Sequence, residues 1–143
     1  MMLLTPDLRF ALRANDIARR AALRDGQPEP DPAPLLKLFN PAGAATWLAT
    51  ELAEDGDTLF GLADLGFGCP ELGYFSLSEI ALVRLPFGLR IERDIGFETP
   101  FPLSVWATRS RAAGSILHAQ ALLFRAAQGD ARPPLPPSEP DAG

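Results

Sequence analysis

The sequence predicts an α+β domain: a small, mostly antiparallel sheet of about four to five strands, with an N-terminal helix, a short capped helix in the middle and a C-terminal helix. Three observations predict this class. A helix-start signal stands at Thr5, apolar segments separated by turn residues follow between residues 35 and 64, and a second helix-start signal stands at Ser76. The 143 residues are enough for one hydrophobic core.

The first predicted element is a helix that begins after Thr5. Threonine is a favoured N-cap, Pro6 fits the first helical position, and Asp7 suits the positive end of the helix dipole. We expect this helix to run to about Arg24. An extended connector is expected after it, because residues 27–34 contain four prolines. The apolar residues expected on the buried side of the helix are Leu8, Leu12 and Ile17.

A meander of three strands is predicted next. The segments 35–39, 46–51 and 58–64 are rich in apolar and strand-forming residues, and the sequences 40–43 and 54–57 between them carry turn residues. Because these connections are short, we expect consecutive strands to pair antiparallel.

The middle of the chain carries the sharpest local signal, a Ser-x-x-Glu capping box at Ser76 and Glu79. The Ser76 hydroxyl is expected to accept the Glu79 backbone N–H, and the Glu79 carboxylate to accept the Ser76 N–H. A glycine-rich loop is expected over 66–73, and a short helix over 77–84, ahead of Pro86. The residues expected to be buried by this helix are Leu77, Ile80 and Ala81.

The C-terminal half is expected to hold one more strand and a helix. Apolar residues alternate with charged ones over 89–95, which predicts a strand whose apolar face is interrupted by Arg93. A helix is expected over 103–117, with Gly114 as its weak point. We therefore expect a single domain over 1–117, a helical extension over 118–129 and a disordered proline-rich tail over 130–143.

Negative charge is concentrated in the middle of the chain. The net formal charge is −5, and residues 33–103 hold four basic residues against ten acidic ones. An acidic centre repels a phosphate backbone, so it disfavours binding to nucleic acid; it suits a basic protein partner, or simply keeps the domain soluble, which is the commoner role. Nucleic-acid binding through the arginines of the first helix ranks last, because residues 1–32 hold as many acids as arginines. Those arginines are Arg9, Arg13, Arg19, Arg20 and Arg24.

The compartment and the covalent chemistry follow from two further observations. Cys69 is the only cysteine, which excludes an intrachain disulfide and a CxxC metal clip. The opening apolar run is too short for a signal peptide, and no run is long enough to span a membrane. We therefore expect a cytoplasmic protein with no membrane segment and no cofactor; the oligomeric state and any bound metal stay open.

Several sequence blocks stand in a distinctive order along residues 3–117. They are LLTP from residue 3, KLFNP from residue 37, TWLATE from residue 46, FGLAD from residue 60, CPELGYFSLSE from residue 69 and GLRIERD from residue 88. In this order they resemble DUF2958, a family of bacterial domains found often on plasmids and integrative elements. The resemblance implies a small accessory protein of mobile DNA. It brings no catalytic residues, because the family is one of unknown function.

Six residues form the candidate functional cluster. Carboxylate oxygens are the ligands that Mg²⁺ prefers, and paired carboxylates can divide acid and base roles. Glu51 and Asp64 each end a predicted strand, and the two strands are neighbours, so these carboxylates can converge. Against a metal site, no D-x-D or other fixed ligand spacing occurs, and strand-end carboxylates are usually only solvated. The cluster comprises Glu51, Asp64, Glu71, Tyr74, Arg93 and Asp94.

Arg93 has two readings. In a strand it points away from its acidic neighbours, toward the apolar side of Leu89 and Ile91. A half-buried guanidinium needs a partner, and Asp64 or Glu51 is expected to supply it. We favour such an internal ion pair over an anion-binding arginine.

Other patterns carry weaker signals. The loop 66–73 is not a phosphate-binding sequence, and the lone His118 gives Cys69 no expected base. Aromatic residues on the strands are expected in the core rather than as stacking platforms, since no basic groove accompanies them. They are Trp47, Phe60, Tyr74, Phe75 and Phe97.

The sequence therefore favours a non-enzymatic accessory or interaction domain that binds a protein partner through an acidic surface. The alternative is a carboxylate-based divalent-metal enzyme acting on nucleic acid or nucleotides. This alternative requires Glu51, Asp64 and a third acid to meet around one concave site.

Overall fold

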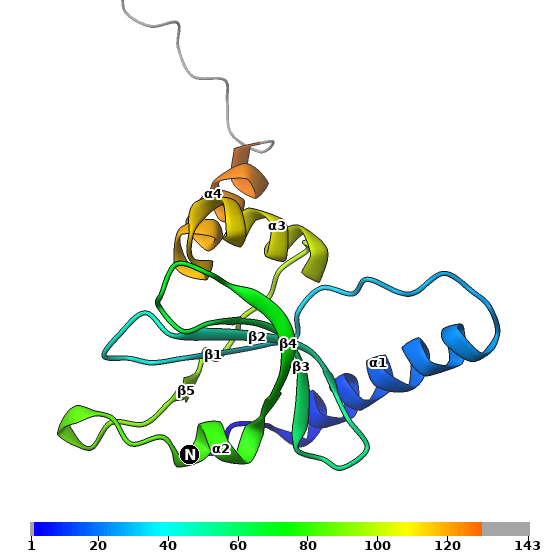
Figure 1. Cartoon of the computed structure of the whole chain (residues 1–143), viewed down its shortest axis with the longest axis horizontal. Helices are drawn as coiled ribbons and strands as arrows, with labels where there is room; N and C mark the ends of the chain where they lie inside the picture. Colours follow the sequence, from blue (N-terminus) through cyan, green and yellow to red (C-terminus); the bar gives the residue numbers. More distant parts are fainter. Residues whose placement is uncertain (1, 130–143) are drawn as a thin grey trace, which may run out of the picture.

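Ten segments of regular structure follow one another along residues 2–129, the residues that the computed structural model describes (Figure 1). The helices are α1 (Pro6–Arg24), α2 (Leu77–Leu82), α3 (Leu103–Ala113) and α4 (Ile116–Gly129), with a 3-10 turn η1 (Pro86–Gly88). The strands are β1 (Leu36–Phe39), β2 (Thr46–Leu52), β3 (Thr58–Asp64), β4 (Glu71–Ser76) and β5 (Glu92–Arg93). The predicted α+β class is confirmed; the predicted tail over 130–143 lies outside the described residues.

The five strands form one antiparallel sheet in the order β4-β3-β2-β1-β5. The predicted meander over β1, β2 and β3 is confirmed and gains β4 as a further neighbour. Gly61 of β3 lies opposite Gly73 of β4. A Cβ at Gly61 would stand 1.8 Å from the carbonyl oxygen of Leu48, so β2 and β3 approach each other here as only glycine permits.

A β-bulge in β2 changes which side chains face which way. The register with β3 shifts between Ala49 and Glu51. After the shift Leu52 lies opposite Leu59, and both belong to the core on the α1 side of the sheet. Glu51 lies opposite Phe60, which packs toward α3. The bulge therefore places Glu51 on the sheet face that α3 covers.

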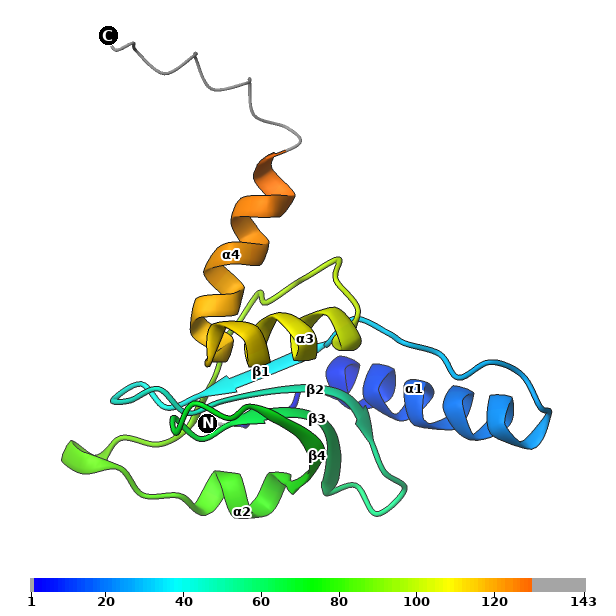
Figure 2. The same ribbon diagram turned by 45° about the horizontal axis from the view of Figure 1, so that its top comes forward.

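Two hydrophobic clusters lie on the two faces of the sheet. On the first face, here called the α1 face, Leu12 of α1 and Ile80 of α2 pack with strand residues such as Leu38. On the second, here called the α3 face, Trp106 of α3 and Leu123 of α4 pack with Leu48 and Leu62. Figure 2 shows α3 and α4 above the sheet and α2 below it. The domain boundary predicted at residue 117 falls inside α4.

Helix α1 begins as predicted, but one expected core residue is not buried. The Leu8 N–H donates to Thr5 Oγ1 over 3.1 Å, which confirms the N-cap. Leu12 is fully buried, whereas Ile17 is 56% exposed and Asp16 is buried in its place. The prediction for Ile17 is wrong because five residues turn a helix by about 140° relative to Leu12, whereas Asp16 follows Leu12 by one turn. A charged residue thus occupies the inner face.

The middle segment corrects three expectations. The loop predicted over 66–73 ends earlier, because β4 begins at Glu71 and pairs with β3. Helix α2 ends at Leu82 rather than at residue 84. Its Ala81 is exposed instead of buried, and Ile80 alone is fully buried in this helix. Leu77 is partly buried and packs against the same core as Ile80.

The C-terminal half corrects two more. The strand predicted over 89–95 shrinks to two residues, since Leu85 N–H donates to the Leu89 carbonyl and folds residues 85–89 into their own turn. The helix predicted over 103–117 breaks at Gly114, whose φ of 82° ends α3 and lets α4 begin at Ile116. Within residues 2–129, no helix combines the length and the apolar character that crossing a bilayer requires.

Candidate functional site

Asp64 holds two chain segments together through its carboxylate. It is fully buried; its Oδ1 accepts the Gly66 N–H over 2.8 Å, and its Oδ2 accepts the Ile116 N–H over 2.9 Å. The first bond closes the turn after β3, and the second caps α4. Both oxygens are thus used by the backbone, which gives Asp64 a structural task.

Glu51 belongs to a different network, on the other end of the β2–β3 pair. Nε of Arg19 on α1 donates to both carboxylate oxygens of Glu51, at 3.0 and 2.9 Å. Arg19 also reaches Asp16, and the buried carboxylate of Asp16 accepts from Arg13 at 2.7 Å and from Arg20 at 3.1 Å. Arg13 donates further to the carbonyl of Leu52. Two acids and three arginines therefore fasten α1 to the bulge of β2.

Burial and pairing shift the two carboxyl groups in opposite directions. Burial opposes the charge of Asp16, but the hydrogen bonds from Arg13 and Arg20 outweigh it and hold the pKa of Asp16 below its ordinary value. Burial also raises the pKa of Glu51, and the hydrogen bonds from Arg19 offset this only in part because Asp16 lies close by. Glu51 is therefore the acid of the pair that protonates first.

Asp94 pairs with a buried lysine rather than with the rest of the expected cluster. Lys37 of β1 donates from Nζ to Gln120 Oε1 of α4 over 2.8 Å, and its Nζ lies 3.4 Å from Asp94 Oδ2. Arg93 pairs with neither Asp64 nor Glu51, so the predicted ion pair is wrong; its Nε is buried without a hydrogen-bond partner in the described chain. The short β5 places Arg93 opposite Leu38, on the α1 face, away from both acids.

The capping box at Ser76 is half confirmed. The Glu79 N–H donates to Ser76 Oγ over 3.1 Å, as predicted, but the Glu79 carboxylate makes no return bond within residues 2–129. Asp57 adds two other bonds at the start of the helix: it accepts from the Ser76 hydroxyl at 2.6 Å and from the Ser78 N–H at 2.8 Å. These two bonds lower the pKa of Asp57. The turn before β3 thus caps α2.

The structure does not gather the candidate cluster into one site. Glu51 lies opposite Phe60 whereas Asp64 lies opposite Thr46, five residues away along β2. Among the described residues, no three His, Cys, Asp or Glu side chains stand where they could share a metal ion. What the sheet does align is Glu51, Phe60 and Tyr74, which occupy one cross-strand row on the α3 face. The rings of Phe60 and Tyr74 lie 5.0 Å apart.

Strand β4 is the outer edge of the sheet and is open along its backbone. The Leu77 N–H donates to the Asp57 carbonyl at the end of the β3–β4 pair. The backbone N–H and C=O groups of successive strand residues point to alternate sides. Like those of Leu77, the groups of Gly73 and Phe75 therefore face β3, and those of Leu72 and Tyr74 face outward. No strand pairs with that side in the described part of the chain.

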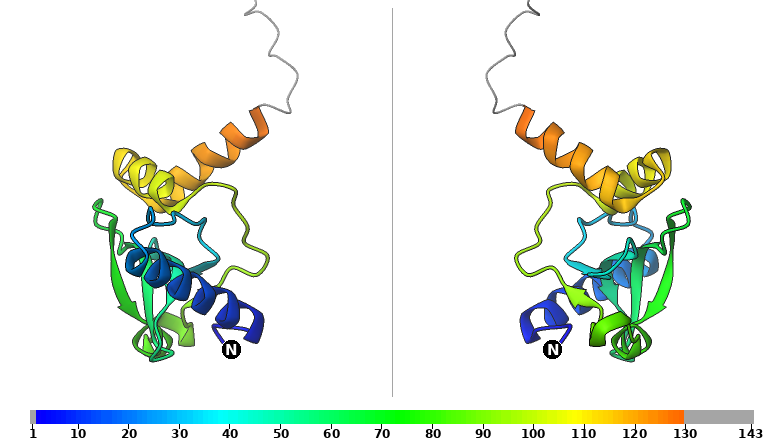
Figure 3. Two further views of the ribbon diagram at one scale, coloured as in Figure 1. Left: turned by 90° about the vertical axis from the view of Figure 1, so that its right-hand side faces the viewer. Right: turned by 90° about the vertical axis from the view of Figure 1, so that its left-hand side faces the viewer.

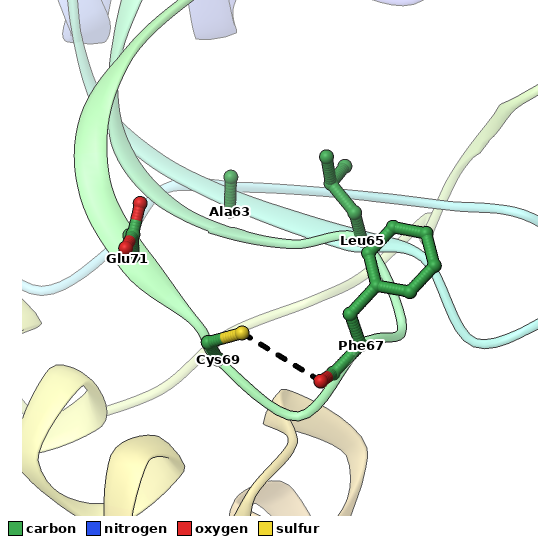
Figure 4. Close-up of a pocket in the computed structure, with 5 residues that line it drawn as sticks. All are labelled: Ala63, Leu65, Phe67, Cys69 and Glu71. Atoms are coloured by element: carbon green, nitrogen blue, oxygen red, sulfur yellow. Dashed lines mark hydrogen bonds between the residues drawn. The ribbon is translucent and has the colours of Figure 1, made fainter.

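The side chains around this edge are apolar and exposed. Tyr74 is 68% exposed, and Leu72, opposite Leu62, is also exposed on the α3 face. At the turn that joins β3 to β4, Leu65 and Phe67 are exposed and line a shallow cavity of about 240 Å³ with Ala63, Cys69 and Glu71 (Figure 4). The Cys69 thiol lies 3.6 Å from the carbonyl oxygen of Phe67.

A second cavity lies beside β4 on the α3 face. It measures about 170 Å³, and Phe60 and Leu72 contribute to it from the sheet and Leu103 from α3. Glu29, Asp31 and Glu51 bring carboxylates to its walls. Asp31 accepts from the N–H and hydroxyl of Ser104 at the start of α3, and Glu51 is paired with Arg19. Of these three carboxylates, those of Glu29 and Asp31 enter no ion pair within residues 2–129.

The arginines of α1 do not form an open basic patch. Arg13, Arg19 and Arg20 bind Asp16 or Glu51, as described above. Arg9 donates to the Gly56 carbonyl, and Arg24 lies 3.7 Å from Asp25. Three of the five charges, those of Arg13, Arg19 and Arg20, are therefore compensated within the molecule.

Three residues that matter to these networks carry no strong sequence signal. Arg13, Asp16 and Arg20 stand at helical i, i+3 and i, i+4 spacing, which is the signal that could have found the network. Such spacing is more often a solvated face. Lys37 stands in an apolar strand, where its charge alone points to a buried partner.

Comparison with known proteins gives one match. Residues 3–117 match the model of the family described as "Protein of unknown function (DUF2958)". No curated protein and no solved structure matches the chain significantly.

Proposed function

The chain belongs to the DUF2958 family of proteins of unknown function, and we propose that it is a non-enzymatic interaction domain that binds an extended, basic segment of a partner protein along β4. One observation carries the proposal: among residues 2–129, no strand pairs with the outer side of β4, whose outward backbone groups at Leu72 and Tyr74 are accompanied by exposed apolar side chains. Proteins usually blunt such an edge with charge, proline or a covering element. Within the part of the chain that the structure describes, none of these lies at the centre of the β4 edge.

The edge supports strand addition by its chemistry. An added peptide strand takes its affinity from main-chain hydrogen bonds and its specificity from pockets for alternate side chains. The outward backbone groups of Leu72 and Tyr74 can form the main-chain hydrogen bonds. The two cavities at the edge, one lined by Phe67 and one by Phe60, can accept the side chains.

Charge supports a basic partner. Glu71 begins β4 and Glu79 follows it, both exposed, and neither enters an ion pair among residues 2–129. Glu29 adds a third unpaired carboxylate at the wall of the α3-side cavity. An extended segment with lysine or arginine between apolar residues meets these acids while its apolar side chains meet Leu72 and Phe67.

The positions of Glu51 and Asp64 support this proposal over the carboxylate-based enzyme, because among residues 2–129 these acids do not meet. Asp64 spends both oxygens on backbone N–H groups, and Glu51 is bound by Arg19 at a distance from it. The proposal keeps the context that the family resemblance implies, an accessory protein encoded on mobile genetic elements, acting in the cytoplasm through a protein partner.

Selection from a library of random twelve-residue peptides tests the proposal on the full chain. We expect the enriched peptides to alternate apolar residues with lysine or arginine and to bind less tightly as salt rises. Tyr74→Lys places a charge on the edge itself, and we expect it to weaken binding at least tenfold. Ala81→Lys adds the same charge on the exposed side of α2, and we expect it to change binding less than threefold.

The outcomes distinguish strand addition at β4 from a general effect of charge. Peptides that bind the wild type and lose affinity only for Tyr74→Lys support strand addition at β4. Equal losses for the two lysine variants indicate a general charge effect and contradict a role for the edge. Enrichment of acidic peptides, or of none, contradicts the proposal as a whole.

A further inference from the structure

Helix α1 carries a second apolar face that nothing in the described chain covers. Its inner face packs on β2 through Leu12, and Figures 1 and 3 show its outer side directed away from the sheet. On that outer side stand Phe10, Ala14, Ile17 and Ala21. Phe10 is 78% exposed, and Ile17 and Ala14 are exposed as well. A single sheet can bury only one side of a helix, so the second apolar side of α1 stays exposed.

The spacing of this outer face is that of a helix–helix seam. Its four apolar residues follow one another at intervals of four, three and four, which is the heptad pattern of paired helices. Asp7 and Arg24 continue the same pattern, at intervals of three, beyond the two ends. The seam therefore runs almost the whole length of α1 and ends in an acid at one end and a base at the other.

We propose that two copies of this chain pair through α1, with the two helices antiparallel around a two-fold axis midway between Ala14 and Ile17. This arrangement sets Phe10 of one copy against Ala21 of the second, and Ile17 against Ala14. Each large side chain thus meets a small one, the complementarity that close helix packing requires. A two-fold interface also uses the same patch on both copies and closes without leaving a free surface.

Charge selects the antiparallel arrangement. At each end of the paired helices, Asp7 of one copy meets Arg24 of the other. A parallel pair would instead bring Asp7 against Asp7 and Arg24 against Arg24. Asp7 enters no ion pair within residues 2–129, and Arg24 has only the 3.7 Å contact with Asp25. Both end charges are thus available for the second copy.

The flanking arginines do not oppose the pairing. Arg13 and Arg20 lie beside the seam, but Asp16 binds both, so their positive charges are compensated within each copy. The surface is also separate from the β4 edge, so a dimer and the proposed peptide complex can form independently. An interface limited to one helix pair is small, and we expect the dimer to dissociate on dilution.

Sedimentation velocity of the full chain over a range of concentrations tests the pairing. We expect the wild type to shift from monomer to dimer as concentration rises. Ile17→Glu puts a charge at the centre of the seam and is expected to leave only monomer. Leu82→Glu makes the same change at an exposed position of α2 and is expected to keep the dimer. Circular dichroism checks that each variant is folded.

A charge exchange tests the orientation. Asp7→Lys and Arg24→Glu are each expected to weaken the dimer at least threefold, and the double variant to restore it, since opposite charges then meet again at each end. A wild type that stays monomeric at its highest soluble concentration overturns the proposal. So does a dimer that survives Ile17→Glu, one that Tyr74→Lys abolishes, or a double variant that is no better than the single ones.

Discussion

Arg19 of α1 donates from Nε to both oxygens of Glu51 at the bulge of β2, over 3.0 and 2.9 Å. The two residues are 32 positions apart in sequence, and their contact fixes where the helix lies along the sheet. Asp16 shares Arg19 and adds Arg13 and Arg20 to the same network. The sheet whose β4 edge we propose as the binding surface is thus joined to α1 by charge as well as by apolar packing.

Asp16→Asn is expected to destabilise the fold more than Glu51→Gln. Asp16 is almost fully buried and faces three guanidinium groups; losing its charge leaves those of Arg13 and Arg20 without an anion and costs about 3 kcal/mol. Burial already raises the pKa of Glu51, so a neutral side chain there costs about 1 kcal/mol or less. Urea unfolding at neutral pH measures both values. A larger cost for Glu51→Gln would contradict the proposed roles.

The same two residues predict opposite responses to pH. The folded-state pKa of Asp16 lies below its ordinary value of 3.8, so its contribution is present above that pH and is lost as pH falls through the folded-state pKa. The advantage of the wild type over Asp16→Asn should therefore shrink below about pH 4. The pKa of Glu51 lies above its ordinary value of 4.5, so stability from this group falls as pH rises above 4.5. Relative to Glu51→Gln, the wild type should lose stability over that rise.

Asp64→Asn is expected to cost about 2 kcal/mol, because an amide offers one acceptor oxygen where the carboxylate offers two. Either the Gly66 N–H or the Ile116 N–H then loses its partner. Hydrogen exchange should accelerate at Gly66 or at Ile116, and the cavity beside β4 should be unaffected. Unchanged exchange at both amides would contradict the structural task of Asp64.

Local signals in the sequence were sufficient where a contact spans only a few residues. The N-cap at Thr5, the meander and the Ser76–Glu79 bond each depend on neighbours within one turn or one hairpin. The sequence was insufficient where distant segments compete. Asp57, 19 to 21 positions away, bonds to the start of α2, where the sequence predicted the Glu79 carboxylate as the second capping group. Asp64 accepts the backbone N–H of Ile116, 52 positions away, and it does not meet Glu51 as the sequence predicted.

The candidate site was only partly predictable for the same reason. Tyr74 and Glu71 were singled out from their sequence block, and both lie on the exposed edge strand. Their shared strand could not be read from the sequence, because Gly66, Gly68 and Gly73 make this block look like a loop. Whether a strand forms here depends on β3 being present to pair with it, which is a tertiary property.

Gly61→Ala and Gly73→Ala form a matched pair with very different expected costs. A Cβ at Gly61 would stand 1.8 Å from the Leu48 carbonyl oxygen and 2.8 Å from Ala49 Cα, so the backbones of β2 and β3 would have to separate. We expect a loss of more than about 3 kcal/mol, or no folded protein. At Gly73, directly opposite on β4, nothing lies within 4 Å, and the change should stay within about 1 kcal/mol. Thermal unfolding measures both; equal costs would contradict the close approach of β2 and β3.

Phe87→Asn is expected to stabilise the protein. Phe87 has a φ of 63° and is 98% exposed, so its backbone is in the left-handed region while its side chain buries almost no surface. A bulky residue in this region costs about 1 kcal/mol or more, whereas asparagine adopts it readily. Phe67→Asn is the control, because Phe67 is also exposed but has no positive φ. Urea unfolding should show a gain of about 1 kcal/mol for Phe87→Asn and none for Phe67→Asn. If neither variant gains stability, the turn over 85–89 relieves the strain at Phe87, and its conformation carries no cost that folding must offset.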